Sequence, residues 1–300
     1  MRGGIRMLAP AKLNLLLSVG PRSGDGYHEV RTVLQAISLW DRILLADDAE
    51  LTVRCSDPRI DGGPRNLAWR AADALRTAAG LDAGATIHVR KGIPAEAGLG
   101  GGSADAAAVL VGCNRLWGLH WSLDRLAAVA AGLGADVPFF LAGGTALGEG
   151  RGDRLTPLPT LPPWPVVVAC PAAGSPTGAA YAALDALGDW RRPSVADALA
   201  ECRRATGLRS RAGRLRLAGL LANSFEDALL PARPDIAALK HRLAAEGAAA
   251  ALLCGSGSAV WALAPSLRWA GGTAARLRAD GVWARVARFE AGGVRGAFEP

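Results

Sequence analysis

A glycine-rich segment, Pro94-Ala-Glu-Ala-Gly-Leu-Gly-Gly-Gly-Ser-Ala104, stands directly before an alanine-rich run. Glycines have no Cβ atoms, so they let a bulky anion approach the backbone and can turn several N–H groups toward it. The alanine-rich run predicts a helix with Ser103 as its N-cap, ending near Trp117 and stopped by Gly118. The unpaired N–H groups of a first helical turn attract negative charge. The segment therefore predicts a phosphate-binding loop.

The spacing of these glycines differs from the two common nucleotide-binding loops. The segment lacks the Gly-Lys-Ser/Thr ending of the P-loop and the Gly-x-Gly-x-x-Gly spacing of dinucleotide-binding folds. A flexible turn before a packed helix is the alternative interpretation of the same composition. Composition alone leaves both interpretations open.

Two charged residues elsewhere are candidates for chemistry. Lys12 is one of only three lysines among 34 basic residues. Its presence in an arginine-rich chain indicates that this position requires the compact ammonium group of lysine. Asp136 stands in the segment Gly-Ala-Asp-Val-Pro, where Pro138 stiffens the turn and so fixes the carboxylate. The structural alternatives are a surface lysine on an edge strand and an aspartate that only terminates a helix.

The elements that must position these groups belong to a mixed chain. Residues 5–19 alternate in a way that predicts a strand, and short apolar runs at 43–45, 51–53 and 86–89 predict further strands. Residues 66–79 have the pattern of an amphipathic helix. Antiparallel strands mixed with helices predict the α+β class.

The length and a proline-rich break predict two domains. Three hundred residues, half of them apolar, are enough for two domains of ordinary size. The proline-rich segment 156–165 cannot continue a helix or a central strand, so we place the boundary there, with domains at 1–160 and 166–300. Residues 166–170 predict a buried strand, and residues 248–263 predict a strand, a glycine turn and a second strand.

Composition excludes several classes of protein. The net charge of +7 comes from arginines that are dispersed and not interleaved with aromatic residues, which favours an anionic small-molecule partner over nucleic acid. The arginine-rich stretch 191–216 is interpreted as a solvated helical face, with a binding patch as the alternative. Five widely separated cysteines support neither a zinc site nor a disulfide framework, and no metal site is expected.

Two apolar segments bear on location. The run after the first basic residues is short and interrupted by Asn14, and residues 126–147 contain Asp136 together with four glycines and one proline. These interruptions argue against a signal peptide and against a membrane span. We therefore expect a cytoplasmic protein without a membrane partner, and the sequence leaves the oligomeric state open.

Three segments together resemble the signatures of a known family. Residues 9–17, 94–104 and 253–260 resemble, in order and spacing, the three motifs of the GHMP small-molecule kinases, named for galactose, homoserine, mevalonate and phosphomevalonate. Segments 22–28, 133–140, 148–152 and 223–229 are most similar to those members that act on a cytidine-diphosphate-linked methylerythritol in the non-mevalonate isoprenoid pathway. The resemblance covers nearly the whole chain.

This resemblance implies a fold and a reaction. The fold would be the two-domain GHMP kinase fold, with a ribosomal protein S5 domain 2-like N-terminal domain, a ferredoxin-like C-terminal domain and the active site in the cleft between them. The reaction would move the γ-phosphoryl group of ATP to the tertiary 2-hydroxyl of the cytidyl substrate. The implied cofactors are ATP and Mg²⁺, the latter carried largely by the nucleotide.

The resemblance also implies roles for individual residues. Asp136 would be the base and Lys12 the charge stabiliser. The substrate would contact Asn14, Tyr27 through stacking, and His28 through a hydrogen bond to the cytosine edge. The turn Gly255-Ser256-Gly257 would close the cleft, although a plain hairpin is an alternative for it. ATP would be bound by Pro94, Ala95, Glu96, Ala97, Gly98, Leu99, Gly100, Gly101, Gly102, Ser103 and Ala104. The sequence does not fix the contacts to adenine, for which Asn66 and Lys91 are candidates.

The chain departs from the family pattern at two positions. Ala104 and Cys254 stand where the family often has serine, which puts details of nucleotide or magnesium binding in doubt. Asp105 favours the helix dipole but opposes a phosphate, and the sequence does not decide whether it turns away or assists Mg²⁺. A different GHMP kinase would lack the stretch 22–28, and a non-catalytic module would be expected to lose Asp136 or the loop glycines.

Overall fold

The computed structural model describes residues 4–24, 26–188, 190, 193–204 and 210–297. The first half of the chain contains β1 (Ile5–Arg22), β2 (His28–Asp48), β3 (Leu51–Cys55), α1 (Leu67–Ala79), β4 (Gly84–Arg90), α2 (Gly101–Leu116), α3 (Leu123–Ala131), α4 (Val137–Ala142), β5 (Thr145–Glu149) and β6 (Arg154–Leu158). The second half contains β7 (Pro165–Cys170), α5 (Thr177–Leu187), α6 (Val195–Arg203), α7 (Arg211–Ala218), β8 (Ala222–Asn223), α8 (Phe225–Ala232), α9 (Pro234–Ala245), β9 (Ala250–Leu253), β10 (Val260–Leu263), α10 (Leu267–Ala279), β11 (Trp283–Arg288) and β12 (Arg295–Ala297). The α+β class is confirmed.

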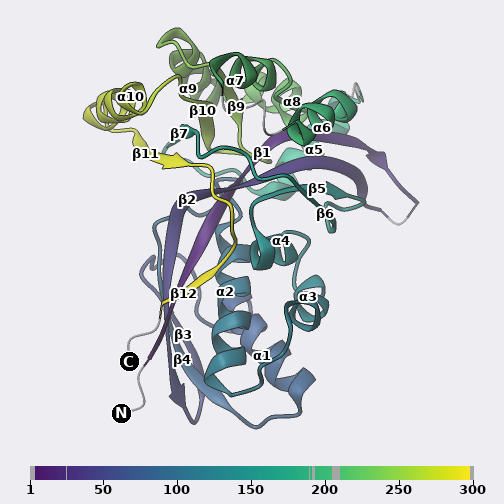
Figure 1. The fold of residues 1–300 in the computed structure, drawn as a ribbon, viewed down its shortest axis with the longest axis vertical. Helices are drawn as coiled ribbons and strands as arrows, with labels where there is room; N and C mark the ends of the chain where they lie inside the picture. Colours follow the sequence, from purple (N-terminus) through teal and green to yellow (C-terminus); the bar gives the residue numbers. More distant parts are fainter. Residues whose placement is uncertain (1–3, 25, 189, 191–192, 205–209, 298–300) are drawn as a thin grey trace.

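The first sheet carries the long strands β1 and β2, which pair in antiparallel fashion. Its order is β12-β1-β2-β4-β3. In addition, β5 pairs with residues 32–35 of β2, β6 pairs with β5, and β8 pairs with β1. Helices α1 to α4 lie in the lower half of the view beside this sheet (Figure 1). The alanines of α2 are fully buried there, because small side chains let the helix approach the sheet and its neighbouring helices closely.

The second sheet is antiparallel throughout, in the order β11-β7-β10-β9. Helices α9 and α10 contribute buried leucines and alanines to a core with this sheet. A separate core joins the two halves, because Leu13 and Leu15 of β1 pack in one cluster with Val166 of β7 and Trp261 of β10. The long strands therefore belong to both halves, as their path through Figure 1 shows.

The end of the described chain returns to the first sheet. Strand β12 pairs antiparallel with Arg6 to Leu8 of β1, and Val294 N donates to Phe140 O at 2.8 Å. Strand β6, which includes the start of the proline-rich segment, pairs with β5 alone among the described strands, as expected where prolines interrupt a ladder. The division at 160 and 166 stays a prediction.

Several local predictions agree with the structure. Asn66 caps α1 by accepting a hydrogen bond from Ala68 N at 2.8 Å. Residues 250–263 form the expected strand, turn and strand.

The prediction of Ser103 as an N-cap is wrong: Gly100 is the cap and the helix begins at Gly101. Gly100 adopts φ +73°, so the chain enters the helix before it reaches Ser103.

The arginine-rich stretch is partly described. Arg191, Arg192 and Arg209 lie outside the described residues. Helices α6 and α7 occupy much of the remainder, and Arg204 and Arg216 both pair with the buried carboxylate of Glu201, at 3.2 and 2.9 Å. The Arg216 pair joins α7 to α6, whereas the Arg204 pair lies within α6 and its C-cap. Within the described residues, none of the helices has the length and apolarity that crossing a membrane requires.

Candidate active site

A cavity of about 690 Å³ lies where the glycine loop meets residues from both halves of the chain. Residues Pro94 to Ser103 line it together with Lys12, Asn14 and Asp136 from the first half and Gly255 and Ser256 from the second. Segments distant in the sequence thus meet in one cavity. It unites the predicted catalytic pair with most of the predicted ATP-binding loop.

The loop conformation requires glycine at two positions. Gly98 and Gly100 have φ values of +74° and +73°, which other residues rarely adopt. A Cβ atom on Gly98 would lie 1.9 Å from Cys254 O, and one on Gly100 would lie 2.7 Å from the ring of Phe140. Glycine is needed here both for the backbone angle and for close packing.

Four consecutive carbonyl oxygens of the loop are engaged by neighbouring segments. Glu96 O accepts from Ser175 N at 3.1 Å, Ala97 O from Ala259 N at 3.1 Å, and Leu99 O from Lys12 N at 3.0 Å. Gly98 O accepts from Cys254 Sγ at 3.3 Å. Because these carbonyl oxygens already accept hydrogen bonds from other segments, they are not free to turn toward a bound phosphate and repel it. This anchoring supports the phosphate-loop interpretation over a flexible turn.

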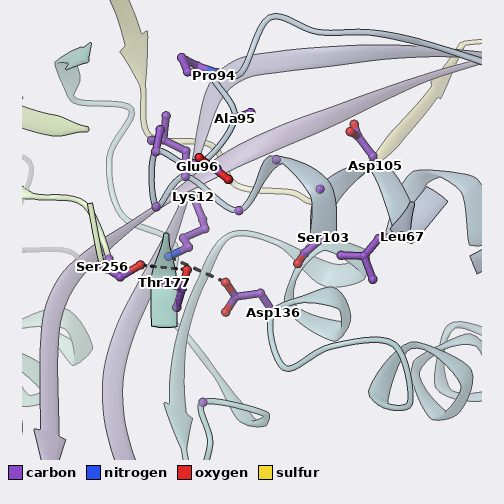
Figure 2. Close-up of a pocket in the computed structure, with 18 of the residues that line it drawn as sticks. Lys12, Leu67, Pro94, Ala95, Glu96, Ser103, Asp105, Asp136, Thr177 and Ser256 are labelled. Carbon is purple, nitrogen blue, oxygen red and sulfur yellow. Dashed lines mark hydrogen bonds and ion pairs between the residues drawn. The ribbon is translucent and has the colours of Figure 1, made fainter. Parts of the chain in front are cut away.

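Lys12 and Asp136 form the charged centre of the cavity. Lys12 Nζ lies 3.9 Å from Asp136 Oδ2 and donates to Asn14 Oδ1 at 2.7 Å. Asn14 in turn donates to Thr32 Oγ1 at 2.8 Å, which fixes its amide orientation. The Asp136 side chain is 35 % exposed and makes no capping bond to α4, so its carboxylate is presented to the cavity. Figure 2 shows Lys12 extending toward Asp136.

The turn of the β9–β10 hairpin reaches this centre from the second half. Asn223 Nδ2 donates to Leu253 O at 2.9 Å and to Gly255 O at 2.8 Å, which fixes the turn. A Cβ atom on Gly255 would lie 3.2 Å from Lys12 Nζ, so a side chain at this position would crowd the ammonium. Ser256 Oγ donates to Thr177 Oγ1 at 3.2 Å (Figure 2). The segment is both a hairpin and a wall of the cavity.

Asp105 is held by a lysine behind the loop. Lys91 Nζ forms ion pairs with Asp41 and with Asp105 Oδ2, the latter at 2.7 Å. Asp41 Oδ1 also accepts from Gly92 N and Ile93 N at 2.6 and 2.9 Å, so it anchors the start of the loop. Burial, opposed by the Lys91 charge, raises the pKa of Asp105 well above its usual range.

In Figure 2, Asp105 and Ser103 project from α2 on different sides, with Ser103 toward Asp136. Asp105 Oδ2 thus bonds to Lys91, and a role of Asp105 beside Mg²⁺ stays open. Asn66 and Lys91 line the cavity, and their place beside the adenine stays a prediction. Sequence reasoning missed Asp41, whose local signal is only a carboxylate shortly before the apolar run 43–45.

Cys254, one of the departures from the family pattern, keeps a donor where serine is common. Its Sγ donates to Gly98 O and, at 3.5 Å, to Lys12 O. Burial raises the pKa of this thiol to about 11, so it stays protonated at neutral pH and can keep donating. Cys113 is also fully buried, as expected of a small apolar residue.

Four described residues of the predicted site, Tyr27, His28, Ala104 and Gly257, do not line the cavity. Tyr27 is 53 % exposed and stacks under the guanidinium of Arg151, whose Cζ lies 3.6 Å from the ring centre. His28 is buried behind Tyr181, with ring centres 4.9 Å apart, and its Nδ1 donates to Gly20 O at 2.8 Å. Tyr181 and Thr177 of α5 line the cavity and were missed by sequence reasoning.

Comparisons with known proteins bear on this geometry. Residues 66–144 match the family described as GHMP kinases N terminal domain. The chain is 40 % identical over 285 residues to 4-diphosphocytidyl-2-C-methyl-D-erythritol kinase of Geobacter metallireducens, covering 94 % of this chain and 97 % of that protein. It is 44 % identical to the kinase of the same name of Salinispora arenicola, covering 98 % and 94 %.

The chain belongs to the 4-diphosphocytidyl-2-C-methyl-D-erythritol kinase family. A solved 4-(cytidine 5'-diphospho)-2C-methyl-D-erythritol kinase has a TM-score of 0.78 at 37 % identity, covering 96 % of this chain and 99 % of that one. A homoserine kinase from Cytophaga hutchinsonii, at 20 % identity and a TM-score of 0.74, shows the same fold. The predicted GHMP kinase fold is confirmed, and so is the prediction of a small-molecule kinase.

Proposed function

We propose that this kinase transfers the γ-phosphoryl group of ATP to the 2-hydroxyl of 4-(cytidine 5'-diphospho)-2-C-methyl-D-erythritol. The observation that carries the proposal is the Lys12–Asp136 pair, 3.9 Å apart in the cavity that the glycine loop also lines. Relatives that cover nearly the whole chain are named for this substrate. We also place the enzyme in the cytoplasm, as a protein that acts on a small anionic molecule and not on nucleic acid.

Asp136 acts as the base in this proposal. Phosphoryl transfer needs a positioned acceptor, charge stabilisation on the phosphoryl oxygens and a group that takes the hydroxyl proton. Asp136 is partly exposed to the cavity, so an acceptor hydroxyl can reach hydrogen-bond distance of its carboxylate. The proton passes from the hydroxyl to Asp136 Oδ as the oxygen attacks the γ-phosphorus, while the bond from that phosphorus to the bridging oxygen breaks and ADP leaves.

Lys12 stabilises the negative charge that develops on the transferred group. Its ammonium is buried and fixed by Asn14, so it needs little reorganisation during the reaction. The loop residues 94–104 bind the phosphates of ATP, since the carbonyls at 96 to 99 are engaged elsewhere and the first turn of α2 follows directly.

Magnesium enters the site with the nucleotide in this proposal. Asp105 Oδ2 is paired with Lys91, and Ser103 and Asp136 are two further oxygen-bearing side chains that line the cavity beside the end of the loop. Both are oxygen ligands of the kind that Mg²⁺ accepts. The ion would neutralise charge on the phosphates. Among the described residues, no group of three histidine, cysteine or acidic side chains is arranged to hold a metal.

Acceptor binding is assigned to the part of the cavity beside Asn14, Gly255 and Ser256. Tyr181 lines the cavity there with an aromatic ring. His28 packs against Tyr181, and Tyr27 packs against Arg151, which also lines the cavity. The proposal keeps Tyr27 and His28 as residues of the cytidine site, with Tyr181 between His28 and the cavity. Gly257 shapes the hairpin turn.

The test is a substrate comparison. ADP release should be rapid with the cytidyl substrate and near background with homoserine or mevalonate. The Asp136→Asn variant serves as the control for contaminating kinases, because it retains the fold and the loop. Faster turnover of homoserine or mevalonate than of the cytidyl substrate would contradict the proposal.

A further inference from the structure

Asn223 and Ser224, where β8 passes into α8, are bonded to the strand that carries Lys12. Strand β8 pairs in parallel with β1. Ser224 N donates to Leu17 O at 2.9 Å, and Ser224 Oγ accepts from Val19 N at 3.1 Å. Both residues of this pair are buried. The backbone at 223–224 is therefore fixed on β1, the same strand from which Lys12 reaches the cavity.

The Asn223 side chain directs both of its donor hydrogens to the hairpin turn between β9 and β10. Its Nδ2 donates to Leu253 O at 2.9 Å and to Gly255 O at 2.8 Å. Its Oδ1 accepts from Phe225 N at 3.0 Å, at the first residue of α8. Because carbonyl oxygens only accept hydrogen bonds, the amide nitrogen has to face the turn. One buried amide thus links β1 and the start of α8 to the turn.

This turn borders the groups at the centre of the cavity. A Cβ atom on Gly255 would lie 3.2 Å from Lys12 Nζ and 3.4 Å from Asn14 Oδ1. The next residue, Ser256, lines the cavity and donates to Thr177 Oγ1 at 3.2 Å (Figure 2). Asn223 is not among the residues that line the cavity, so any effect that it has on the reaction passes through the turn.

We propose that Asn223 is a positioning residue for phosphoryl transfer, which holds the Gly255–Ser256 turn in place beside Lys12. The inference rests on the proposed function, in which Lys12 stabilises the transferred group. A charge stabilises a transition state best when its surroundings are already in place, and displacements of about 1 Å are costly. Without the two donors of Asn223, the carbonyls at 253 and 255 lose their partner in a buried site. The turn would then move to satisfy them and leave its place beside the ammonium.

Two substitutions and one matched control separate this role from a purely structural one. Asn223→Asp removes both donors but keeps an oxygen that accepts from Phe225 N, whereas Asn223→Ala removes donors and acceptor together. Asn114→Asp makes the same chemical change at a second buried asparagine, which does not line the cavity. Asn114 Nδ2 donates to Trp121 O at 3.1 Å, and its Oδ1 accepts from Trp121 N at 2.9 Å.

Three quantities are measured for each protein: kcat from ADP release with the cytidyl acceptor, the melting temperature, and amide hydrogen exchange at residues 254–259. The amides at 257, 258 and 259 are hydrogen-bonded in the folded protein, so their exchange reports on the turn. We expect both Asn223 variants to lower kcat about tenfold or more and to exchange faster at 254–259. Asn114→Asp should lower the melting temperature without changing kcat or this exchange.

The Asp and Ala variants give opposite orders under the two roles. If Asn223 only held the start of α8, Asn223→Asp would be more active than Asn223→Ala, because the acceptor is kept. Parental kcat in a folded Asn223→Ala, or an equal loss of kcat in Asn114→Asp, would overturn the proposal. Should Asn223→Asp fail to fold, Asn223→Ala decides. Failure of the parent enzyme to phosphorylate the cytidyl acceptor would instead contradict the proposed function, and unchanged exchange at 254–259 would overturn the role of Asn223 independently of activity.

Discussion

Lys12 Nζ lies 3.9 Å from Asp136 Oδ2, and a Cβ atom on Gly255 would lie 3.2 Å from the same ammonium. The three positions come from β1, from the residue preceding α4, and from the hairpin turn of the second half. The turn between β9 and β10, in the second half of the chain, therefore lies next to the charged pair. Its chemistry depends on the two halves being held together.

Asp136→Asn should reduce kcat on the order of a hundredfold or more while leaving ATP binding largely intact. The amide cannot take the hydroxyl proton, yet it has nearly the same shape. Steady-state ADP release and calorimetric titration with ATP measure the two effects. The exposed Asp124→Asn in α3 is the control. Near-parental turnover of Asp136→Asn would remove Asp136 from the role of base.

Lys12→Arg should be as inactive as Lys12→Met, both losing on the order of a hundredfold in kcat. The positive charge is retained in the arginine variant. The larger guanidinium, however, has little room, because Asn14 bonds to the ammonium and even a Cβ atom at position 255 would lie only 3.2 Å from it. Rescue of turnover by arginine would show that charge alone suffices and that the enclosure by Gly255 is unimportant.

Gly98→Ala should destabilise the protein by about 2 kcal/mol or more, from the left-handed backbone and the clash with Cys254 O. Gly102→Ala is the matched comparison. Its Cβ would meet nothing closer than Leu67 Cδ1 at 3.7 Å, and it lies in the first turn of α2, where alanine stabilises by about 0.5–1 kcal/mol. Thermal unfolding of the two variants should shift in opposite directions. Equal shifts would contradict the assigned loop conformation.

The stability difference between the parent protein and Asp105→Asn should depend on pH. Burial raises the pKa of Asp105 in the folded state, so the folded protein binds more protons than the unfolded chain between the two pKa values. The parent should therefore lose stability relative to Asp105→Asn as the pH rises from about 4 toward the raised pKa. Denaturant midpoints of both proteins across this range test it. Parallel curves would mean that Asp105 ionises as easily in the folded protein as in the unfolded chain.

Local patterns in the sequence predicted much of the fold. The helix at 66–79 and the strands at 250–263 follow from short-range periodicity and from a capping residue that acts within its own turn. The start of α2 was predicted at Ser103 because serine is the usual cap. The structure uses Gly100 instead, since a left-handed glycine packed against Phe140 ends the loop earlier than a side-chain cap would.

The candidate site was predicted less completely. Glycines and a rare lysine mark the loop and Lys12, and family resemblance supplied Asp136. The Asp41–Lys91–Asp105 network joins β2, the loop and α2, and pairings over such separations leave no periodic signal. Likewise, the stacking of Arg151 on Tyr27 depends on where two turns meet after the sheet has formed. In the sequence, the nearest signal of this contact was Tyr27 itself.

Strand β12 completes one edge of the first sheet with residues 295–297, while Val294 bonds to Phe140 next to the end of α4. Residues 5–160 include most of this sheet and emerge from the ribosome first. They cannot acquire their last strand until residue 297 has also emerged. The nascent chain thus exposes an open β-edge until residues 295–297 arrive, and its charged pair stays uncovered until the hairpin at 250–263 has formed.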